Sequence, residues 1–314
     1  MNPPNNASAI IAEDLHMSFG DVHALRGISL DVPRGTVLGL LGPNGAGKTT
    51  AVRILTTILV PTSGRAWVNS IDVVADPHSV RRTIGLAGQY AAVDEDLTGR
   101  ENLMLIGALS HVSKAQSAQR AVELLDQFRL TDAGDRAIKT YSGGMRRRLD
   151  LAAALITHPP VLLLDEPTTG LDPASRQDLW AVIEGLVDDG TTVLLTTQYL
   201  EEADRLADSI VVINQGTIAA QGTAAELKSR IGETLLAVTV DSEADAARAV
   251  AALASLAPGS SQHGAEVHVP LRGGAQVVRD ILNHLDTSGI ALGRIDIHEP
   301  TLDDVFLSIT GGLA

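Results

Sequence analysis

The residues best suited to chemistry stand together near the start of the chain. They fit the phosphate-binding template G-x-x-x-x-G-K-[ST] and read Gly42-Pro43-Asn44-Gly45-Ala46-Gly47-Lys48-Thr49. The three glycines permit backbone conformations that a Cβ would forbid, so successive N–H groups can surround phosphate oxygens. Lys48 adds a positive charge for the β- and γ-phosphates, and the Thr49 hydroxyl is suited to hold Mg²⁺.

The sequence on either side of this motif predicts the strand and the helix that the motif requires. Residues 36–41 form an apolar run that predicts a buried strand, and residues 50–58, which begin with Thr50, predict a helix. The N-terminal end of that helix would direct its dipole at the same anion. The alternative is a glycine-rich turn that matches by chance, and the flanking elements argue against it.

Two adjacent carboxylates end another apolar run. Val161-Leu162-Leu163-Leu164 is followed by Asp165 and Glu166. Because ligands bind at the carboxyl ends of strands in an open parallel sheet, we expect these acids to lie beside the phosphates. Asp165 suits the surroundings of Mg²⁺, and Glu166 can polarise a water molecule for attack on the γ-phosphate. The alternative, a helix N-cap with a first-turn acid, fits poorly because Pro167 follows at once.

A bare helix end lies between these two motifs. Ser142 is a favourable N-cap, and Gly143 and Gly144 leave the first turn of a predicted helix, residues 143–157, without side chains. Such an end can bind an anion. Arg146-Arg147-Arg148 follows, and we expect this run to be a solvated helix face rather than a nucleic-acid patch.

Three further side chains are weaker candidates. Phe19 lies in a turn between two predicted strands, 9–17 and 27–32, where it could stack on a purine ring or fill the core. Gln89 follows the predicted strand 82–87 and could bind Mg²⁺ or water, although many strands end in glutamine. Gln198 ends the apolar strand 191–197.

The composition limits the classes of partner. The 314 residues include 38 acidic and 24 basic side chains, a formal net charge of −14. An acidic chain is a poor default binder of nucleic acid, so no nucleic-acid partner is expected. With no cysteine there is neither a disulfide framework nor a thiolate metal site. Residues 1–8 lack the pattern of a secretory signal, and the apolar runs are too short to span a bilayer, so another chain would have to do so.

The apolar pattern predicts two domains. Residues 9–231 alternate strands and helices, and residues 97–128 are helical in pattern, which predicts a helical subdomain, about 90–158, inserted in an α/β core. Residues 232–314 repeat strand and helix in the order βαβαβα, with a polar loop at 258–264. This order predicts a small C-terminal α+β domain, for which a ferredoxin-like fold is one form.

Together these motifs resemble the nucleotide-binding subunits of ABC transporters, over about residues 9–231. They follow the family's order: Walker A at 42–49, the Q-loop at Gln89, the signature at 141–145, Walker B at 161–165 with Glu166, the D-loop at 170–172 and the switch position at Gln198. The resemblance implies a P-loop nucleotide-hydrolase fold with ATP and Mg²⁺ as cofactors. It implies that Phe19 stacks on adenine, that Lys48, Glu166 and Gln198 act in catalysis, and that Thr49, Gln89 and Asp165 lie near the metal.

The chain is similar, more closely, to the daunorubicin-resistance type of drug-exporter ATP-binding protein. The shared segments are Tyr-Ser-Gly-Gly-Met at 141–145, Thr-Gln-Tyr-Leu-Glu-Glu at 197–202 and Glu-Pro-Thr-Leu-Asp-Asp-Val-Phe at 299–306. Met145 stands where the family usually has glutamine, and Gln198 where it usually has histidine. Gln198 cannot become cationic, so its hydrogen bond to the γ-phosphate should be weaker and basal hydrolysis slow.

The resemblance also implies partners. Two copies, as a homodimer, would dock head to tail so that Ser142, Gly143 and Gly144 of one chain cap the ATP of the other. A polytopic membrane permease subunit would receive the movement through a groove near Gln89, with Tyr90–Thr98 lining the contact. The ATP-binding subunits would lie at the cytoplasmic face of the cell membrane and power efflux of drugs or other hydrophobic compounds.

Two other classes of function compete with this prediction. The main alternative is a soluble ABC-type ATPase that moves no solute, but the tandem cores of a ribosome-associated factor and the coiled coil of a DNA-repair ATPase are absent from the sequence. A non-hydrolytic ATP sensor is the other, and the presence of Lys48 and Glu166 argues against it.

Overall fold

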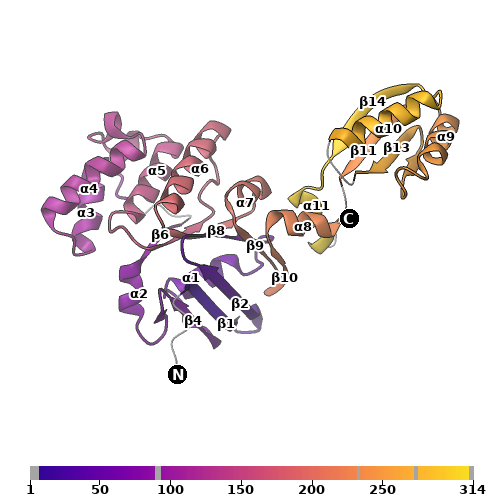
Figure 1. Ribbon diagram of the computed structural model, residues 1–314. Coiled ribbons are helices and arrows are strands. Elements are labelled where there is room, and N and C mark those ends of the chain that lie inside the picture. Colours follow the sequence, from indigo (N-terminus) through magenta and orange to yellow (C-terminus); the bar gives the residue numbers. More distant parts are fainter. Residues whose placement is uncertain (1–6, 89–92, 232–233, 272–274, 311–314) are drawn as a thin grey trace. The chain divides into compact units, whose positions relative to one another are not determined.

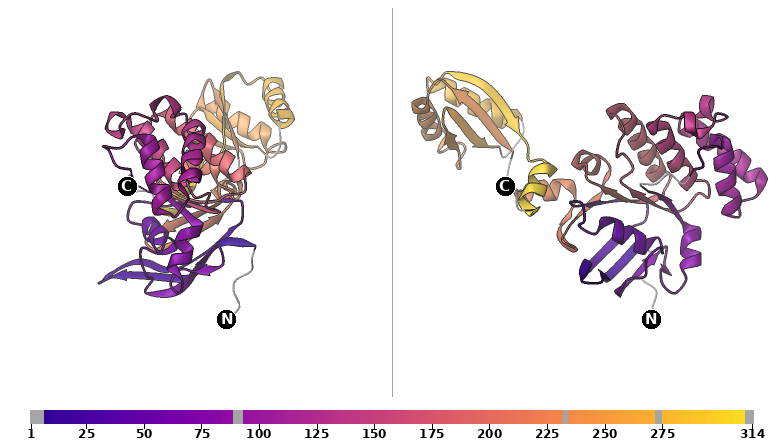
Figure 2. Two further views of the ribbon diagram at one scale, coloured as in Figure 1. Left: turned by 90° about the vertical axis from the view of Figure 1, so that its left-hand side faces the viewer. Right: turned by 180° about the vertical axis from the view of Figure 1, so that it is seen from behind.

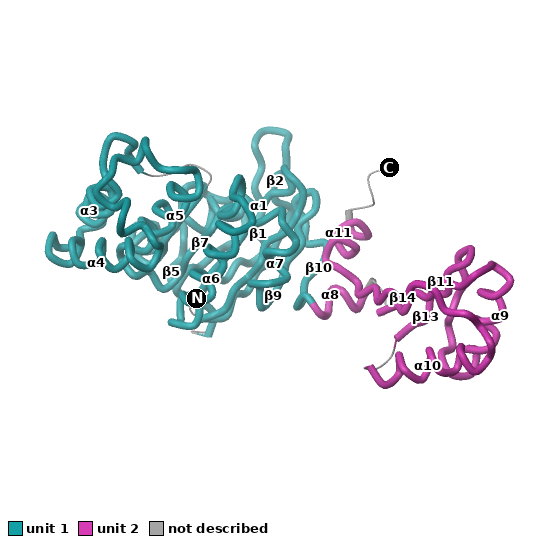
Figure 3. Tube along the Cα trace, turned by 90° about the horizontal axis from the view of Figure 1, so that it is seen from above, with its two compact units in different colours: residues 1–224 teal, residues 225–314 magenta. Residues whose placement is uncertain are grey.

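The computed structural model describes residues 7–88, 93–231, 234–271 and 275–310. It contains two compact units, residues 1–224 and 225–314 (Figure 3). The sequence predicted a domain boundary after residue 231, whereas the structure divides the chain after residue 224. Helix α8 (Ala224–Ile231) therefore lies almost entirely in the second unit and not, as predicted, in the first.

The centre of the first unit is a six-stranded sheet in the order β10-β9-β3-β8-β7-β6. Strands β3, β6, β7, β8 and β9 are parallel, and β10 pairs antiparallel with β9. The strands are β3 (Val37–Leu41), β6 (Ile84–Ala87), β7 (Val161–Asp165), β8 (Thr192–Thr197), β9 (Ser209–Asn214) and β10 (Thr217–Gly222). Strands β3, β7 and β8 are buried at every position, as a parallel sheet covered on both faces requires. The predicted α/β core is confirmed.

A second, antiparallel sheet has the order β2-β1-β4-β5. Its strands are β1 (Ser8–Phe19), β2 (Val22–Pro33), β4 (Ser63–Val68) and β5 (Ile71–Asp72). The hairpin of β1 and β2 is longer than predicted because Phe19 still pairs with Val22. Phe19 therefore ends a strand instead of lying in the turn.

Helix α1 (Lys48–Leu55) lies between the two sheets (Figures 1 and 2). The opposite face of the six-stranded sheet packs on α6 (Pro173–Asp188) and α7 (Leu200–Leu206). Successive residues of β7 alternate between the two cores, because side chains of a strand point to opposite faces. The carboxyl ends of β3, β7 and β8 are thus fixed between two packed layers.

The described residues between β6 and β7 form helices and turns. These elements are α3 (Gly99–Leu109), α4 (Lys114–Gln127), the 3-10 turns Thr131–Ala133 and Ile138–Thr140, and α5 (Gly143–Ala154). The predicted continuous helix is interrupted between α3 and α4, where His111 has a positive φ and Ser113 caps α4. Before β6, residues predicted as strand at positions 82 and 83 instead end helix α2 (Pro77–Thr83), which Asp76 caps.

The second unit is an α+β domain with the antiparallel sheet order β12-β13-β11-β14. Its further elements are β11 (Leu235–Val240), α9 (Glu243–Leu253), β12 (Ser261–His263), β13 (Glu266–Pro270), α10 (Ala275–Thr287), β14 (Leu292–His298) and α11 (Leu302–Thr310). The predicted polar loop at 258–264 is wrong, because β12 lies there and pairs with β13. The resulting order from β11 to β14 is βαββαβ, which is the ferredoxin-like arrangement.

None of the helices in the described ranges combines the length and the apolar character needed to cross a bilayer.

Candidate nucleotide-binding and hydrolysis site

The loop between β3 and α1 depends on glycine for its path. Gly42 and Gly47 have φ values of 152° and 115°. A Cβ on Gly42 would lie 2.2 Å from the carbonyl oxygen of Ile213, and one on Gly47 would lie 2.6 Å from that of Ala24. Gly45, with φ 79°, faces open space. Conformation therefore favours glycine at all three positions, and neighbouring backbone also excludes a side chain at two of them.

Lys48 lies inside the turn that these glycines allow. Its side chain is 4% exposed, and Nζ donates hydrogen bonds to the carbonyl oxygens of Gly42 at 2.7 Å and Pro43 at 3.2 Å. Burial lowers the pKa of Lys48, and the carboxylates of Glu166 and Asp165 oppose that shift. A partly desolvated ammonium group is stabilised strongly by a nearby anion, because charged hydrogen bonds are the strong ones. Phosphate oxygens bound in the loop would supply that anion.

The remaining loop residues differ in exposure. Asn44 is exposed, Pro43 and Thr50 are half-buried, and Ala46 is buried with its N–H group bound to the carbonyl oxygen of Pro43. Thr50 follows Thr49 in the first turn of α1. The loop therefore offers Asn44 and the main chain to a ligand while Ala46 fixes it to the core.

Asp165 ends β7 and joins three elements. Its Oδ1 accepts hydrogen bonds from the hydroxyl groups of Thr196 in β8 at 2.5 Å and Thr49 in α1 at 3.4 Å. Strand order explains the meeting, because β8 lies between β3 and β7. Hydroxyl and carboxylate oxygens suit Mg²⁺, so Thr49 and Asp165 fit a metal ion beside the phosphates. Gln89, the third residue predicted near the metal, lies outside the described residues.

Glu166 has a left-handed backbone with φ 52°. Such a conformation costs a non-glycine residue about 1–3 kcal/mol and is concentrated at functional sites. Its N–H group donates to both the carbonyl and the hydroxyl oxygen of Thr196, each at 3.1 Å. Its Oε2 accepts from the Thr169 hydroxyl at 3.3 Å. The sequence predicted the acidic pair, but not the left-handed main-chain conformation at Glu166.

Gln198 and Phe19 are both accessible to a ligand. Gln198 follows β8, at the same edge of the sheet as the phosphate loop, and is exposed. The Phe19 side chain is 48% exposed at the end of β1, which excludes the alternative of a core side chain.

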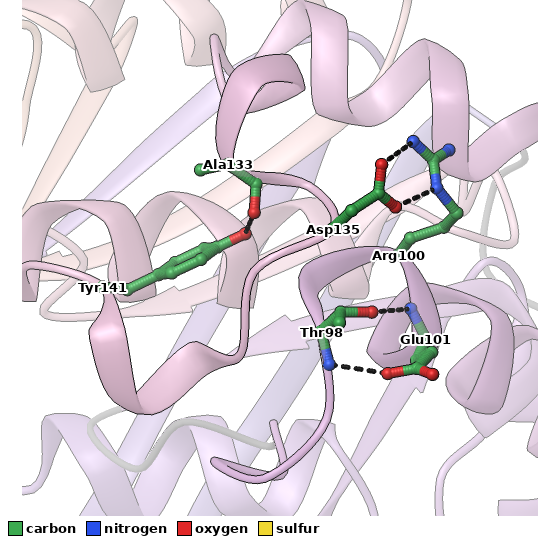
Figure 4. A network of polar contacts seen from close by, with 6 residues as sticks. All are labelled: Thr98, Arg100, Glu101, Ala133, Asp135 and Tyr141. Carbon is green, nitrogen blue, oxygen red and sulfur yellow. Dashed lines mark hydrogen bonds and ion pairs between the residues drawn. The ribbon is translucent and has the colours of Figure 1, made fainter.

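Tyr141 anchors the start of α5 (Figure 4). The ring is buried, and the hydroxyl donates a 2.6 Å hydrogen bond to the carbonyl oxygen of Ala133. Nearby, Nε and a terminal nitrogen of Arg100 bind the two carboxylate oxygens of Asp135, at 2.7 and 3.3 Å, and a capping box begins α3. These contacts hold the loop before α5 against the helical subdomain.

The tip of α5, which we define as Ser142, Gly143 and Gly144, faces outward. The Ser142 hydroxyl accepts the N–H of Met145 at 3.2 Å, and both Ser142 and Gly143 are exposed. The first N–H groups of a helix have no partner within it. Among the described residues, no hydrogen bond joins this tip to the phosphate loop. The Met145 side chain packs against the core instead of reaching outward.

The expectation of a solvated face for the arginine run is wrong for Arg147. The Arg147 side chain is 12% exposed and donates to the main-chain carbonyl groups of Gly88, Asp165, Glu166 and Pro167. Its neighbour Arg146 is half-exposed and pairs with Glu95 at 2.8 Å. Asp150, which is buried one turn farther along α5, pairs with Arg147 at 3.6 Å.

Glu202 is a second buried residue that the sequence did not single out. It lies in α7, which the sequence predicted as a short acidic helix, and it is fully buried. Its Oε1 accepts the indole N–H of Trp180 at 3.0 Å, and burial raises the pKa of its carboxyl group.

A phosphate loop after β3 and an acidic pair after β7, at one edge of a parallel sheet, define a P-loop nucleotide hydrolase. The ABC transporter family model matches residues 25–169, and the model for the C-terminal domain of DrrA1-3-like ATP-binding proteins matches residues 222–310. The daunorubicin resistance ATP-binding protein DrrA2 of Streptomyces coeruleorubidus is 51% identical over 306 residues, covering 96% of this chain and 95% of that protein. The chain belongs to the ATP-binding proteins of ABC transporters, in the daunorubicin-resistance group.

Solved structures of ABC cassettes resemble the chain in the same way. The ATP-binding subunit of an ABC transporter matches with a TM-score of 0.65 and 28% identity, over 71% of this chain and 93% of that one. A bacterial ABC transporter cassette described as dimeric matches with a TM-score of 0.63 and 25% identity, over 68% of this chain and 98% of that one. The chain is therefore an ATP-binding and ATP-hydrolysing subunit of an ABC exporter, as predicted, and these matches do not support the non-transport alternative.

Proposed function

We propose that two copies of this chain close head to tail around two ATP molecules and drive the export of drugs or other hydrophobic compounds. The main support for this proposal is that one chain has both a phosphate loop, with Asp165 and Glu166 beside it, and a separate, outward-facing helix tip. A second copy would bring its tip to the first copy's ATP. The daunorubicin-resistance relative supports the class of exported compound, and the dimeric cassette supports the pairing.

Within one chain, each residue has a task in hydrolysis. Lys48 and the loop N–H groups bind the β- and γ-phosphates, and Phe19 stacks on adenine. Thr49 and Asp165 hold Mg²⁺, which when bound neutralises phosphate charge. Glu166 accepts the proton of the attacking water, and Gln198 donates a hydrogen bond to the γ-phosphate.

The second copy would complete the site with Ser142, Gly143 and Gly144. The helix dipole and free N–H groups of that tip suit the γ-phosphate, which ATP has and ADP lacks. A contact made only with the γ-phosphate lets ATP favour the closed dimer and lets hydrolysis release it.

The test is the oligomeric state of Glu166→Gln, which should bind ATP without consuming it. Light scattering should give a dimer with Mg·ATP and a monomer with Mg·ADP or no nucleotide. The double variant Glu166→Gln with Lys48→Ala is the control and should stay monomeric with ATP. A Glu166→Gln protein that remains monomeric at saturating ATP would overturn the proposal.

The membrane permease subunit would dock at a groove beside β6, the last strand in the order of the described six-stranded sheet. The groove has a volume of about 710 Å³ and lies between α2, β6 and α3. Apolar side chains, including the 71% exposed Leu109, line it beside a basic rim of Arg81 and Arg82. This basic rim on a chain of net charge −14 suits an acidic cytoplasmic segment with an apolar anchor. Of the segment Tyr90–Thr98 predicted to line the contact, residues 90–92 lie outside the described part, and 93–98 lead into α3.

A crosslinking experiment tests this docking site and the cytoplasmic location of the ATP-binding subunits. The sequence has no cysteine, so Leu109→Cys provides a single attachment point in the groove. In inside-out membranes it should crosslink to a polytopic protein. Val122→Cys is the matched control, because Val122 is 55% exposed in the same subdomain but does not line the groove. Equal crosslinking from both positions, or none from Leu109→Cys, would contradict the site.

A further inference from the structure

Arg147 is a buried cation that the hydrolysis scheme does not use. It lies in α5, on the helix turn that follows the exposed tip, and its side chain is 12% exposed. Nε donates to the carbonyl oxygen of Pro167 at 2.6 Å, and one terminal nitrogen donates to those of Glu166 at 2.8 Å and Asp165 at 3.2 Å. The other terminal nitrogen donates to the carbonyl oxygen of Gly88. One side chain thus binds the main chain that leaves two neighbouring strands, β6 and β7.

The guanidinium group is suited to this role by its number of donors. Arginine has five N–H donors in a planar fork, whereas lysine has three on one nitrogen. The four carbonyl contacts and the 3.6 Å ion pair with Asp150 engage all three nitrogens of Arg147. Burial lowers the pKa of Arg147, and the Asp150 carboxylate is the first of the groups that oppose this shift. A lysine at this position would leave at least one buried carbonyl without its donor.

Three of the four carbonyl groups that Arg147 binds, those of Asp165, Glu166 and Pro167, belong to the strained turn at Glu166. The main chain there is left-handed, with φ 52°, and its N–H group is held by Thr196 from β8. Arg147 holds the carbonyl side of the same residue. A strained conformation persists only where its surroundings fix it from several sides. The orientation of the Glu166 carboxylate therefore depends on where α5 places Arg147.

We propose that Arg147 is a positioning residue that couples the two ATP sites of the dimer. This inference rests on the proposed function, in which the tip of α5 serves the second copy's ATP and Glu166 serves the chain's own. When the tip engages the second copy's γ-phosphate, α5 is fixed, and Arg147 in turn fixes the main chain of Glu166. Occupation of one site thereby completes the catalytic geometry of the other, and the coupling is reciprocal for binding.

The test compares Arg147→Lys with wild type in steady-state ATP hydrolysis. We expect wild type to show a Hill coefficient above 1 for ATP. Arg147→Lys should have a Hill coefficient near 1 and a kcat lower by about tenfold, which corresponds to about 1.4 kcal/mol of lost transition-state stabilisation. The affinity of the monomeric chain for ATP should change little, because Lys48 and the phosphate loop are intact. A merely structural residue would not shift the Hill coefficient and kcat while sparing ATP binding.

Arg148→Gln is the matched control. Arg148 is the next residue of α5, and a terminal nitrogen of its side chain donates a 3.3 Å hydrogen bond to the carbonyl oxygen of Phe128 in the helical subdomain. We expect this variant to lower the Tm while retaining the wild-type Hill coefficient and kcat. The same loss of cooperativity in Arg148→Gln would show a general effect of disturbing α5 and would overturn the role of Arg147.

A second measurement separates loss of coupling from loss of folding. In the Glu166→Gln background, Arg147→Lys should still form the ATP-dependent dimer, because the tip and the loop are both unchanged. If Glu166→Gln alone fails to dimerise, the proposed function fails. If it dimerises but Arg147→Lys keeps the wild-type kcat and Hill coefficient, or if the double variant cannot dimerise, the proposed function stands and only the coupling role of Arg147 is overturned.

Discussion

The phosphate loop and the tip of α5 both suit an anion, but different parts of the molecule set their shapes. The loop is a continuous stretch whose glycines and Lys48 fix the geometry among themselves and against adjacent backbone. The tip has little local structure beyond the Ser142 cap, and its place depends on Tyr141, whose hydroxyl group binds the Ala133 carbonyl oxygen in the helical subdomain. Distant substitutions should therefore disturb the tip more readily than the loop.

The two regions also differ in what each lacks for ATP hydrolysis. The loop already has its cation, its hydroxyl group and its acids within one chain, and needs only the nucleotide with its Mg²⁺. The tip has exposed residues and no hydrogen bond to that loop in the described ranges. Binding and turnover should for this reason respond to different substitutions.

Glu166→Gln is expected to have the largest effect and to sharpen the separation of binding from turnover. Removing the general base should lower kcat by about 10²–10⁴-fold. The dissociation constant for ATP should change little, because Lys48 and the loop are unaltered. Phosphate release and nucleotide titration measure the two quantities, and a kcat within tenfold of wild type would count against the role of Glu166.

Matched glycine substitutions compare the two regions directly. Gly47→Ala should weaken ATP binding by tenfold or more, about 1.4 kcal/mol, because its Cβ would lie 2.6 Å from the Ala24 carbonyl oxygen. A Cβ at Gly143 meets nothing within 4 Å, so Gly143→Ala should leave ATP binding by the isolated chain unchanged. It should nevertheless lower the ATPase rate, because the added methyl group occupies the tip. Titration of a fluorescent ATP analogue gives the affinities, and equal losses would break the comparison.

Gln198→His should have a moderate effect and tests the loop side of the site alone. A charged donor makes a hydrogen bond roughly twice as strong as a neutral one, so kcat should rise about five- to tenfold. Histidine is cationic below a pKa of about 6.5, so the gain should be larger at pH 6 than at pH 8. A pH series of ATPase rates on both proteins measures this, with Gln198→Ala as the control that should lose activity. No gain at pH 6 would contradict slow hydrolysis through a neutral switch residue.

Tyr141→Phe should have the smallest effect on the nucleotide site, because it acts on the tip alone. It leaves the Ala133 carbonyl group buried without its 2.6 Å hydrogen bond, which should cost about 1–3 kcal/mol. The Tm should fall by about 2–4 °C per kcal/mol, while ATP affinity of the isolated chain stays constant. Calorimetry with nucleotide titration measures both, and a change in affinity without a change in Tm would show that the two regions are not independent.

The parts of the site that could be predicted from sequence are those set by residue type at fixed spacing. Residues 42–49 dictate their own turn, and an acidic pair after an apolar strand has few structural explanations. Parallel strand order then brings both to one edge, as expected for this fold. The left-handed turn at Glu166 could not be predicted, because contacts from β8 and α5 impose it.

The remaining errors share a physical cause. Arg147 looked like part of a solvated run because the orientation of α5 depends on a sheet formed by distant residues. Strand β12 was missed because all three of its residues, Ser261–His263, are polar and exposed, and only pairing with β13 defines it. Glu202 was counted with an acidic helix because its partner, Trp180, comes from α6.

The exposed tip of α5 has a consequence for assays at low protein concentration. If a complete site needs two chains, the ATPase rate per chain must fall on dilution, because collisions between free copies become rare. A permease that holds two copies side by side would raise their effective concentration to about the millimolar range and remove this dependence. Copies that are not bound to a permease would then hydrolyse little ATP in the cell, so the total rate of ATP hydrolysis would follow the number of assembled transporters.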